Sequence, residues 1–432
     1  MDLPMSLPTA LPTELIAPLY NPATFAKRGA VDTLLTEVRK KYPLAQARVP
    51  GYDPHWIVSR HADIQTVSRQ NALFHNGDKS ATLIPEVGET LVKEFTGGDF
   101  NLFRSLVQLD GEEHKAHRKV LFTALGSGAI QRLVGNLKTT AEEQLAVLRT
   151  HDGGLDFAKE ISMLYPLRAV MDLIGVPRED HLRMLELTQW LFSWADPELM
   201  RPGSDPTKPD GQPRTWKIVF DEFDQYFSTL IQQRRENPLD DLASLIANSE
   251  IDGGPMLHSR AISYFAILAT AGHDSTAHTT ATAMWVLAED RGLFQTLKSD
   301  PSLIPNFVEE AIRWTTPVKH FVRHATDECE LAGQRIAKGD RLYLSYPSGN
   351  RDESEFEDPF TFRLDRKRNR HVGFGYGGHV CLGQHLARLE MIILWETLLP
   401  HLQSVEMSGP GRLIASEFVS GPKSVPVRYT LV

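Results

Sequence analysis

Cysteine is almost absent from this sequence: only Cys329 and Cys381 occur among its 432 residues. Two cysteines exclude a disulfide-stapled fold, and they also exclude a zinc or iron–sulfur site built from cysteines of this chain alone. Such scarcity is typical of a reducing compartment, so we expect a cytoplasmic protein.

Long apolar runs and a positive net charge are also missing. No stretch of about 18 uninterrupted apolar residues occurs, which argues against a transmembrane helix. The proline-punctuated start, with Asp2 near its beginning, does not match a secretory signal. The formal net charge of -9 argues against a general nucleic-acid binder, which needs a basic surface. We therefore expect a soluble monomer with neither a membrane nor a nucleic-acid partner.

Apolar residues at helical spacing cover most of the chain. They predict helices near residues 32–41, 114–125, 130–148, 161–174, 180–192, 216–235, 259–290, 303–314 and 382–399. Strand patterns are short and scattered, around residues 56–58, between 317 and 344, and at the C-terminus, without βαβ alternation. The sequence predicts a mainly α fold with a small β-rich part, preceded by an extended lead-in over residues 1–25.

The segment Arg201–Arg214 is the clearest predicted loop, because it is dense in proline, glycine and aspartate. One interpretation is a linker between two domains. The other is a mobile connection between two helices that covers a pocket and gates entry to it.

A glycine-rich loop leads to Cys381. Four glycines lie in the stretch from Phe374 to Gly383, where the backbone must turn sharply or something must approach it closely. An amphipathic helix follows, so Cys381 lies at a helix N-terminus, where a thiolate is favoured over a thiol. Such a thiolate could bind iron, with Phe374 shielding it from water, while a buried structural cysteine and a catalytic nucleophile are the alternatives.

The spacing F-x-x-G-x-x-x-C-x-G, from Phe374 through Gly377 and Cys381 to Gly383, resembles the haem-binding loop of the cytochrome P450 family. The resemblance covers nearly the whole chain. From Thr270 onward it is greatest with the bacterial soluble class I monoterpene-alcohol (terpineol) hydroxylases, in TAGHDST, RWTTPVK, LSYPSGNRD and HVCLGQHLA. It implies one cytochrome P450 domain over residues 1–432 and a monooxygenase with haem b, whose iron Cys381 binds as the proximal thiolate.

A glycine and several hydroxyl residues interrupt the long predicted helix at Ala271-Gly272-His273-Asp274-Ser275-Thr276. Such residues weaken the hydrogen-bond ladder and can bend a helix, either for packing or to make a groove for dioxygen. The stretch resembles the family pattern A-G-x-D/E-T, except that serine stands where threonine is usual. The resemblance implies that Asp274 and a hydroxyl of Ser275 or Thr276 are catalytic and deliver protons to bound O2.

Glu310 and Arg313 are three residues apart on one predicted helix, so they share a face. Taken alone, such a pair is usually a solvated surface ion pair. It resembles the E-x-x-R helix of the family, which implies that both residues are structural and hold the segment that carries the cysteine.

Several scattered cations and imidazoles match, position by position, the propionate-binding residues of the family. Taken singly, each is more often a surface residue than a ligand contact. The resemblance implies that they bind the haem together with the cysteine loop: His114, Arg118, Arg323 and His379.

The family resemblance also places a set of mainly apolar side chains around the substrate: Phe100, Phe103, Ile267, Thr270, Ala271, Val318, Phe321, Phe418 and Val419. A pocket with this lining suits a small hydrophobic substrate with few polar groups. We expect hydroxylation of a terpenoid or an alkyl-aromatic hydrocarbon.

Electrons must come from elsewhere, because no G-x-G-x-x-G follows a strand and the chain has no room for a fused flavin reductase. The resemblance implies a separate ferredoxin and an NAD(P)H-dependent ferredoxin reductase as partners. Basic residues near the cysteine could dock the ferredoxin, or they could form an ordinary solvated surface: Arg366, Lys367, Arg368, Arg370 and Arg388. A haem-thiolate peroxygenase and a non-catalytic haem-based sensor are the competing functions.

Overall fold

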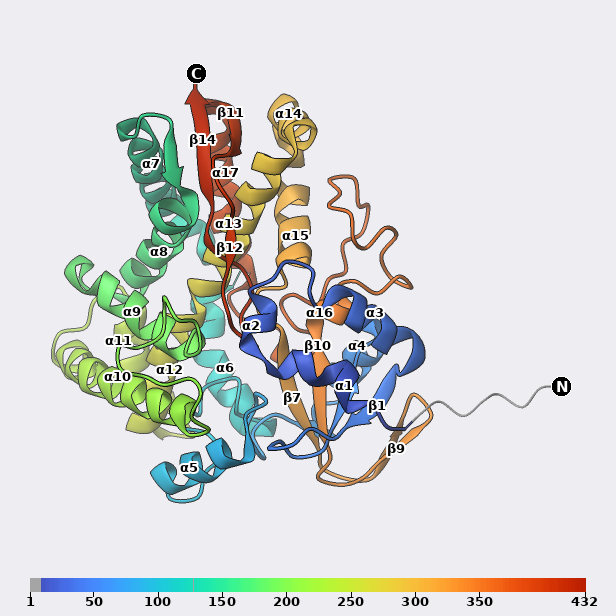
Figure 1. Ribbon diagram of the computed structural model, residues 1–432. Helices are drawn as coiled ribbons and strands as arrows, with labels where there is room; N and C mark the ends of the chain where they lie inside the picture. Colours follow the sequence, from blue (N-terminus) through green and yellow to red (C-terminus); the bar gives the residue numbers. More distant parts are fainter. Residues whose placement is uncertain (1–8, 127) are drawn as a thin grey trace.

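The computed structural model describes residues 9–126 and 128–432, and within them helices dominate (Figure 1). The mainly α prediction is therefore confirmed. The α-helices are α1 (Thr13–Ile16), α2 (Pro22–Phe25), α3 (Asp32–Lys41), α4 (His61–Arg69), α5 (Glu86–Thr96), α6 (Gly111–Leu125), α7 (Val134–Thr150), α8 (Leu164–Ile174), α9 (His181–Phe192), α10 (Gly211–Glu236), α11 (Leu242–Ala247), α12 (His258–Ala271), α13 (Asp274–Glu289), α14 (Arg291–Ser299), α15 (Ile304–Thr315), α16 (Tyr346–Gly349) and α17 (Gln384–Leu398).

One large apolar core joins helices α7, α8, α10, α12, α13, α15 and α17. Helix α15 shows how the sequence builds it: Ile304, Phe307, Val308 and Ala311 recur at helical spacing, and all four are buried. From α17, the fully buried Trp395 packs edge-on against Phe307, with ring centroids 5.3 Å apart. This packing fixes the helices that flank the cysteine loop.

The strands form small sheets beside the helical core (Figure 1). The largest has the order β1 (Leu44–Ala47), β2 (His55–Val58), β10 (Arg341–Ser345), β7 (His320–Ala325), β3 (Phe74–His75). Strands β2 and β10 run parallel, so the N-terminal part pairs with a segment far along the chain. The remaining strands are β11 (Leu402–Met407), β14 (Pro426–Leu431) and β4 (Gly154–Asp156) in one sheet, and the pairs β12 (Arg412–Leu413) with β13 (Pro422–Ser424), β5 (Glu250–Ile251) with β6 (Gly254–Pro255), and β8 (Cys329–Leu331) with β9 (Gln334–Ile336).

The N-terminal segment differs from the expected extended lead-in. Residues 1–8 lie outside the described residues, but residues 13–25 form three short helical turns, so the extended prediction is wrong there. Proline at the start of a turn presets the helical φ angle, and Asn21 caps α2 by accepting from the Ala23 N–H. Ile16 and Leu19 are buried against the sheet, which the proline pattern alone did not reveal.

The long helix expected over residues 259–290 is interrupted rather than merely bent. Helix α12 ends at Ala271 and α13 begins at Asp274. A side chain at Gly272 would place its Cβ 2.3 Å from the Leu268 carbonyl oxygen, so only glycine fits there. The break therefore falls on the predicted glycine and hydroxyl stretch.

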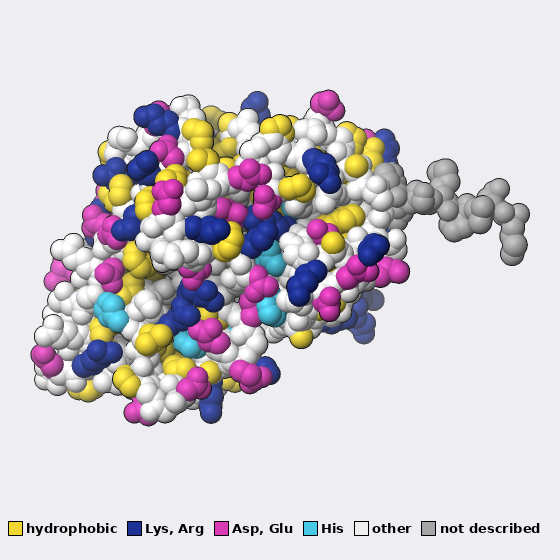
Figure 2. All heavy atoms as spheres, turned by 90° about the horizontal axis from the view of Figure 1, so that it is seen from below, with side chains coloured by type: hydrophobic (Ala, Val, Ile, Leu, Met, Phe, Trp, Pro, Cys, Tyr) yellow, Lys and Arg dark blue, Asp and Glu magenta, His cyan; other side chains and the backbone are white. Residues whose placement is uncertain are grey.

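The predicted loop Arg201–Arg214 is shorter than expected, because α10 already begins at Gly211. No helix in residues 9–126 and 128–432 combines the length and apolarity that crossing a bilayer demands. On the face seen in Figure 2, basic and acidic side chains are interspersed.

Candidate functional site

A cavity of about 380 Å³ lies between the cysteine loop and the break between α12 and α13. Cys381, Asp274 and the turn containing Phe418 all line it. Segments that are far apart in the sequence thus enclose one space. A thiol, a carboxyl group and several hydroxyls thus share one cavity lining.

The cysteine loop is a tight turn that approaches other backbone closely. Gly377 has a φ of +72°, and a Cβ there would lie 2.0 Å from the Ser68 carbonyl oxygen. The Cys381 N–H donates to the Phe374 carbonyl oxygen at 2.8 Å, which closes the loop just before α17. The Cys381 side chain lines the cavity, as do Phe374 and Gly383, and its accessible surface faces this enclosed space rather than the outer surface of the protein.

Several groups besides the helix N-terminus act on the pKa of Cys381. Burial raises the pKa of the thiol, although the backbone N–H groups of Gly383 and Gln384 and the charge of Arg118 lower it. The expectation that the helix end favours the anion is therefore outweighed by desolvation. A cation bound at the sulfur would ionise it, so this donor fits a metal ligand.

Two arginines face the cavity without a carboxylate partner. Arg323 is 3% exposed and donates to the Val322 carbonyl oxygen, and Arg118 donates to the Val380 carbonyl oxygen at 2.7 Å. Neither forms an ion pair with any other part of the described chain. Burial lowers the pKa of both, so each guanidinium would be stabilised by an anionic ligand in the cavity.

Two imidazoles lie beside these arginines. His114 and His379 are stacked with ring centroids 4.0 Å apart. His379 lines the cavity, while His114 does not belong to its wall. His114 Nε2 is buried and makes no hydrogen bond within residues 9–126 and 128–432. Together with the arginines, these side chains form one polar edge suited to the propionates of a haem.

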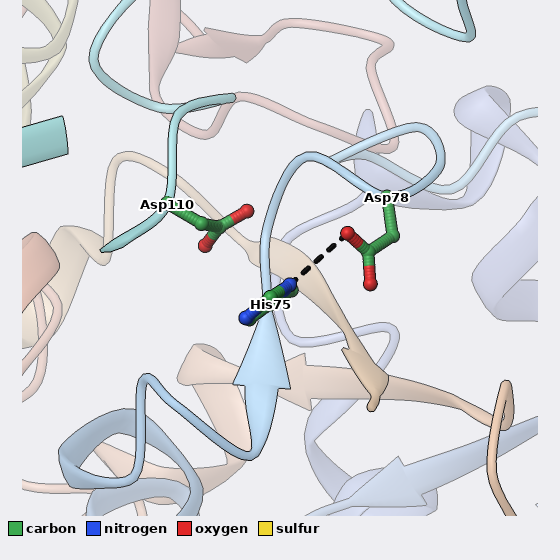
Figure 3. Close-up of side chains that lie close together, drawn as sticks. All are labelled: His75, Asp78 and Asp110. Carbon is green, nitrogen blue, oxygen red and sulfur yellow. Dashed lines mark hydrogen bonds and ion pairs between the residues drawn. The ribbon is translucent and has the colours of Figure 1, made fainter. Parts of the chain in front are cut away.

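The carboxylate behind this edge belongs to Asp110, which also lies near His75 and Asp78 (Figure 3). These three side chains are the one group of potential metal ligands within the described residues. Asp110 is already engaged: its oxygens accept from the backbone N–H groups of Asn76 and Gly77 at 2.7–3.1 Å. We therefore read the group as a structural hydrogen-bond cluster.

Asp274, Ser275 and Thr276, at the break between α12 and α13, all line the cavity. Asp274 is 3% exposed, and burial raises the pKa of its carboxyl group. The hydroxyls of Ser275 and Thr276 make no hydrogen bond to any of the described residues. Both are therefore available to a molecule in the cavity.

All nine side chains predicted for the substrate pocket line this cavity: Phe100, Phe103, Ile267, Thr270, Ala271, Val318, Phe321, Phe418 and Val419. A short antiparallel bridge joins Val318 to Val419, which brings the strand β7 region against the C-terminal turn. Thr270 uses its hydroxyl on the Ala266 carbonyl oxygen at 2.7 Å, so it offers mainly its methyl group.

The sequence reasoning missed a polar part of the wall. Glu417 lines the cavity, and one of its oxygens accepts from Trp194 at 3.0 Å and from Gln212 at 3.2 Å. Glu417 directly precedes the predicted Phe418, and this adjacency was the available signal. These contacts tie the C-terminal turn to the chain on both sides of the loop Arg201–Asp210.

Glu310 and Arg313 lie in the interior, where both side chains are 0% exposed. Two hydrogen bonds of 2.7 and 2.8 Å join them. Arg313 also donates to the carbonyl oxygens of Asn350 and Pro359, and Glu310 accepts from Arg366. The pair thus connects α15 to the irregular segment that precedes the cysteine loop.

Two of the basic residues considered for ferredoxin docking pair with carboxylates of this chain, and one of them is largely buried. Arg366 is 7% exposed on Glu310, and Arg388 pairs with Glu309 at 2.5 Å. Arg370 lies 4.0 Å from Glu355. Including Arg366 in a docking surface was therefore wrong.

Comparison with known proteins gives consistent matches over almost the whole chain. A family model described as Cytochrome P450 matches residues 33–424. The chain is 41% identical over 393 residues to Cytochrome P450-terp from Pseudomonas sp, covering 91% of this chain and 92% of that protein. It is 29% identical over 413 residues to linalool 8-monooxygenase from Pseudomonas putida, covering 95% and 98%.

The fold of this chain also matches solved structures over almost its whole length. CYP108D1 from Novosphingobium aromaticivorans matches with a TM-score of 0.89 at 37% identity, covering 98% of this chain and 100% of that one. CYP268A2 from Mycobacterium marinum, in complex with pseudoionone, matches with a TM-score of 0.85 at 29% identity, covering 94% and 97%. The similarity therefore extends well beyond one loop motif.

Proposed function

This chain belongs to the cytochrome P450 family of monooxygenases, and on that premise we propose that it inserts one oxygen atom of O2 into a compact hydrophobic terpenoid or alkyl-aromatic substrate. One observation carries the proposal: a single cavity joins the loop of Cys381 to the acid and hydroxyl groups at the break between α12 and α13. We further propose that residues 1–432 form one domain.

When bound, haem b supplies the iron centre that activates dioxygen. Cys381 would bind the iron through its ionised sulfur, with Phe374 and Gly383 packed around it. Arg118, Arg323 and the stacked imidazoles of His114 and His379 would hold the propionates. Glu310 and Arg313 would keep the cysteine loop in place and would take no part in the reaction.

Proton delivery is assigned to Asp274 with Ser275 and Thr276. Burial raises the pKa of the Asp274 carboxyl group, which favours the protonated form that could give a proton to a neighbouring hydroxyl. The hydroxyl would in turn pass its own proton into the cavity. A proton relay is needed most when dioxygen is the oxidant, so Asp274 and Ser275 favour the monooxygenase over the peroxygenase.

The apolar wall supports a hydrocarbon-rich substrate, because a cavity of this composition gains free energy by burying apolar surface. The names of two relatives, Cytochrome P450-terp and linalool 8-monooxygenase, support a terpenoid. For electrons we propose NAD(P)H, through a separate ferredoxin reductase and a ferredoxin. Lys367 and Arg368 would contribute to ferredoxin docking.

The test has two stages. First, the purified protein is reconstituted with hemin, reduced and exposed to carbon monoxide. A thiolate-ligated Soret band is expected for the native chain and not for Cys381→Ala, and a colourless protein would overturn the proposal. Second, terpenoids, alkyl-aromatics, fatty acids and macrolides are screened for Soret shifts and turnover. Turnover with peroxide but not with ferredoxin would favour the peroxygenase, and haem binding without any turnover would favour the sensor.

A further inference from the structure

Behind the cavity wall, His278 faces the carboxyl group of Asp274 from the next turn of α13. The two side chains are 1% and 5% exposed, and His278 Nε2 lies 3.5 Å from Asp274 Oδ1. Asp274 lines the cavity and His278 is not part of its wall. Oδ2 of Asp274 and Nε2 of His278 are both buried without a hydrogen-bond partner in the described part of the chain. The imidazole therefore packs against Oδ1 at ion-pair distance without a hydrogen bond.

A backbone carbonyl fixes the tautomer of His278. Nδ1 lies 3.2 Å from the carbonyl oxygen of Pro422, and a carbonyl oxygen can only accept a hydrogen bond. Nδ1 therefore carries its hydrogen whether the ring is neutral or protonated. In the neutral ring Nε2 is a bare acceptor, and this is the atom that faces Asp274.

Gly421 holds the imidazole in this position. A Cβ at Gly421 would lie 2.3 Å from the His278 Cβ and 2.8 Å from its Nδ1. The backbone thus packs directly against the ring, and it does so at a φ of +152°, which favours glycine. The ring has little room to turn away from Asp274.

The other titratable groups around α13 in the described part of the chain do not pair with the carboxyl group of Asp274. His273 is fully buried, and burial lowers its pKa to about 3, so it is neutral at pH 7. Lys423 on β13 is bound to the carboxylates of two other residues, and burial raises the pKa of Glu390 on α17, which disfavours a charge there. Burial raises the pKa of Asp274 and His278 lowers it; no other charged group of the described chain acts on this carboxyl.

We propose that His278 is a positioning residue: its ring, held by the Pro422 carbonyl oxygen and by Gly421, packs against Oδ1 of Asp274 and fixes the orientation of the carboxyl group that lines the cavity. Without this ring the carboxyl group could turn among several rotamers, and a smaller fraction of the molecules would present it in the orientation that proton transfer to the cavity needs.

This inference rests on the proposed role of Asp274, and its first test needs neither substrate nor turnover. Infrared difference spectra of the haem-loaded protein in H2O and D2O report the C=O stretch of protonated carboxyl groups. The band that is lost in Asp274→Asn belongs to Asp274. It should change frequency in His278→Gln, which retains a donor but cannot titrate, and in Gly421→Ala, which displaces the ring.

The matched control is His181→Gln. His181 is also buried, with Nε2 3.0 Å from the Val176 carbonyl oxygen and 3.7 Å from a carboxylate oxygen of Asp172, but it does not line the cavity. This variant should leave the band unchanged. An Asp274 band in His278→Gln that is identical to that of the native protein would overturn the inference.

A second measurement separates this inference from the proposed function. Coupling, the fraction of reducing equivalents recovered as product, should fall roughly tenfold in His278→Gln with the substrate KM unchanged, a smaller loss than removal of a direct acid causes. If Asp274→Asn couples like the native enzyme, the proposed role of Asp274 fails. If Asp274→Asn is impaired while His278→Gln matches the native enzyme in band and coupling, only the role of His278 fails.

Discussion

Replacing Glu310 by alanine tests how much stability one buried ion pair provides near the haem side of the molecule. Glu310 and Arg313 are 0% exposed and are joined by two short hydrogen bonds. Alanine would leave the guanidinium of Arg313 buried without a counterion, and it would also remove the acceptor of Arg366. The expected loss is therefore that of an uncompensated buried charge rather than that of one contact.

Breaking a buried pair on one side costs about 3–5 kcal/mol. This is a large part of a total stability of about 5–15 kcal/mol. Urea unfolding at 25 °C, followed by far-ultraviolet circular dichroism and Soret absorbance, measures the change. The two probes must coincide for a single free energy to apply. We expect Glu310→Ala to lower the free energy of unfolding by that amount and to release haem at lower urea.

Two further variants make the reasoning refutable. Glu112 and Lys115 have the same three-residue spacing and a 2.7 Å contact, but their side chains are 89% and 71% exposed, so Glu112→Ala should have no measurable effect. Replacing Glu310 and Arg313 together by methionine should cost less than Glu310→Ala, because no charge is left unpaired. A Glu310→Ala protein within about 1 kcal/mol of the native one, as for a surface pair, would refute the argument.

Four other outcomes are expected. Cys381→Ala should lose the thiolate-type Soret band of the reduced carbon monoxide complex; an unaltered band would remove the basis of the proposed function. Asp274→Asn should reduce coupling roughly a hundredfold and release the difference as peroxide, measured per NAD(P)H consumed; unchanged coupling would show that another group supplies the protons. Burial raises the pKa of Asp110, but His379 and two backbone N–H groups lower it more strongly, to about 2 from 3.8. Because this folded pKa is depressed, its contribution to stability is present above pH 3.8 and is lost as the pH falls toward 2, and acid titrations of Asp110→Asn should lack it. Finally, amide hydrogen exchange in residues 201–210 should be fast without substrate and slower when an apolar substrate saturates the cavity; equal rates would contradict a lid role for this loop.

Local signals predicted the elements of the site well. The glycine spacing around Cys381 indicated a tight loop, and the break after Ala271 falls where glycine and hydroxyl residues were expected to weaken the helix. Boundaries were less accurate: α10 begins at Gly211, inside the predicted loop, because the helix pattern before Trp216 contains a proline that is tolerated in the first turn of a helix.

The surroundings of charged and ionisable side chains were the property that sequence reasoning predicted least well. Arg366 looks like a surface cation in the sequence, yet it is buried on Glu310. The helix N-terminus at Cys381 suggested an anionic sulfur, but desolvation acts more strongly on its pKa. Both effects depend on which neighbours fold around a side chain, and a linear pattern contains no information on that.

By itself, the sequence determined the family and the mainly helical fold, and it singled out Cys381 as the candidate iron ligand. These results depend on short-range spacing and on residue types. Only the tertiary structure decided that Glu417 reaches the cavity and that His278 faces Asp274 while its Nδ1 meets the Pro422 carbonyl oxygen. The physical reason is that hydrogen bonding and burial are properties of the space around an atom, and residues more than a hundred positions apart create that space.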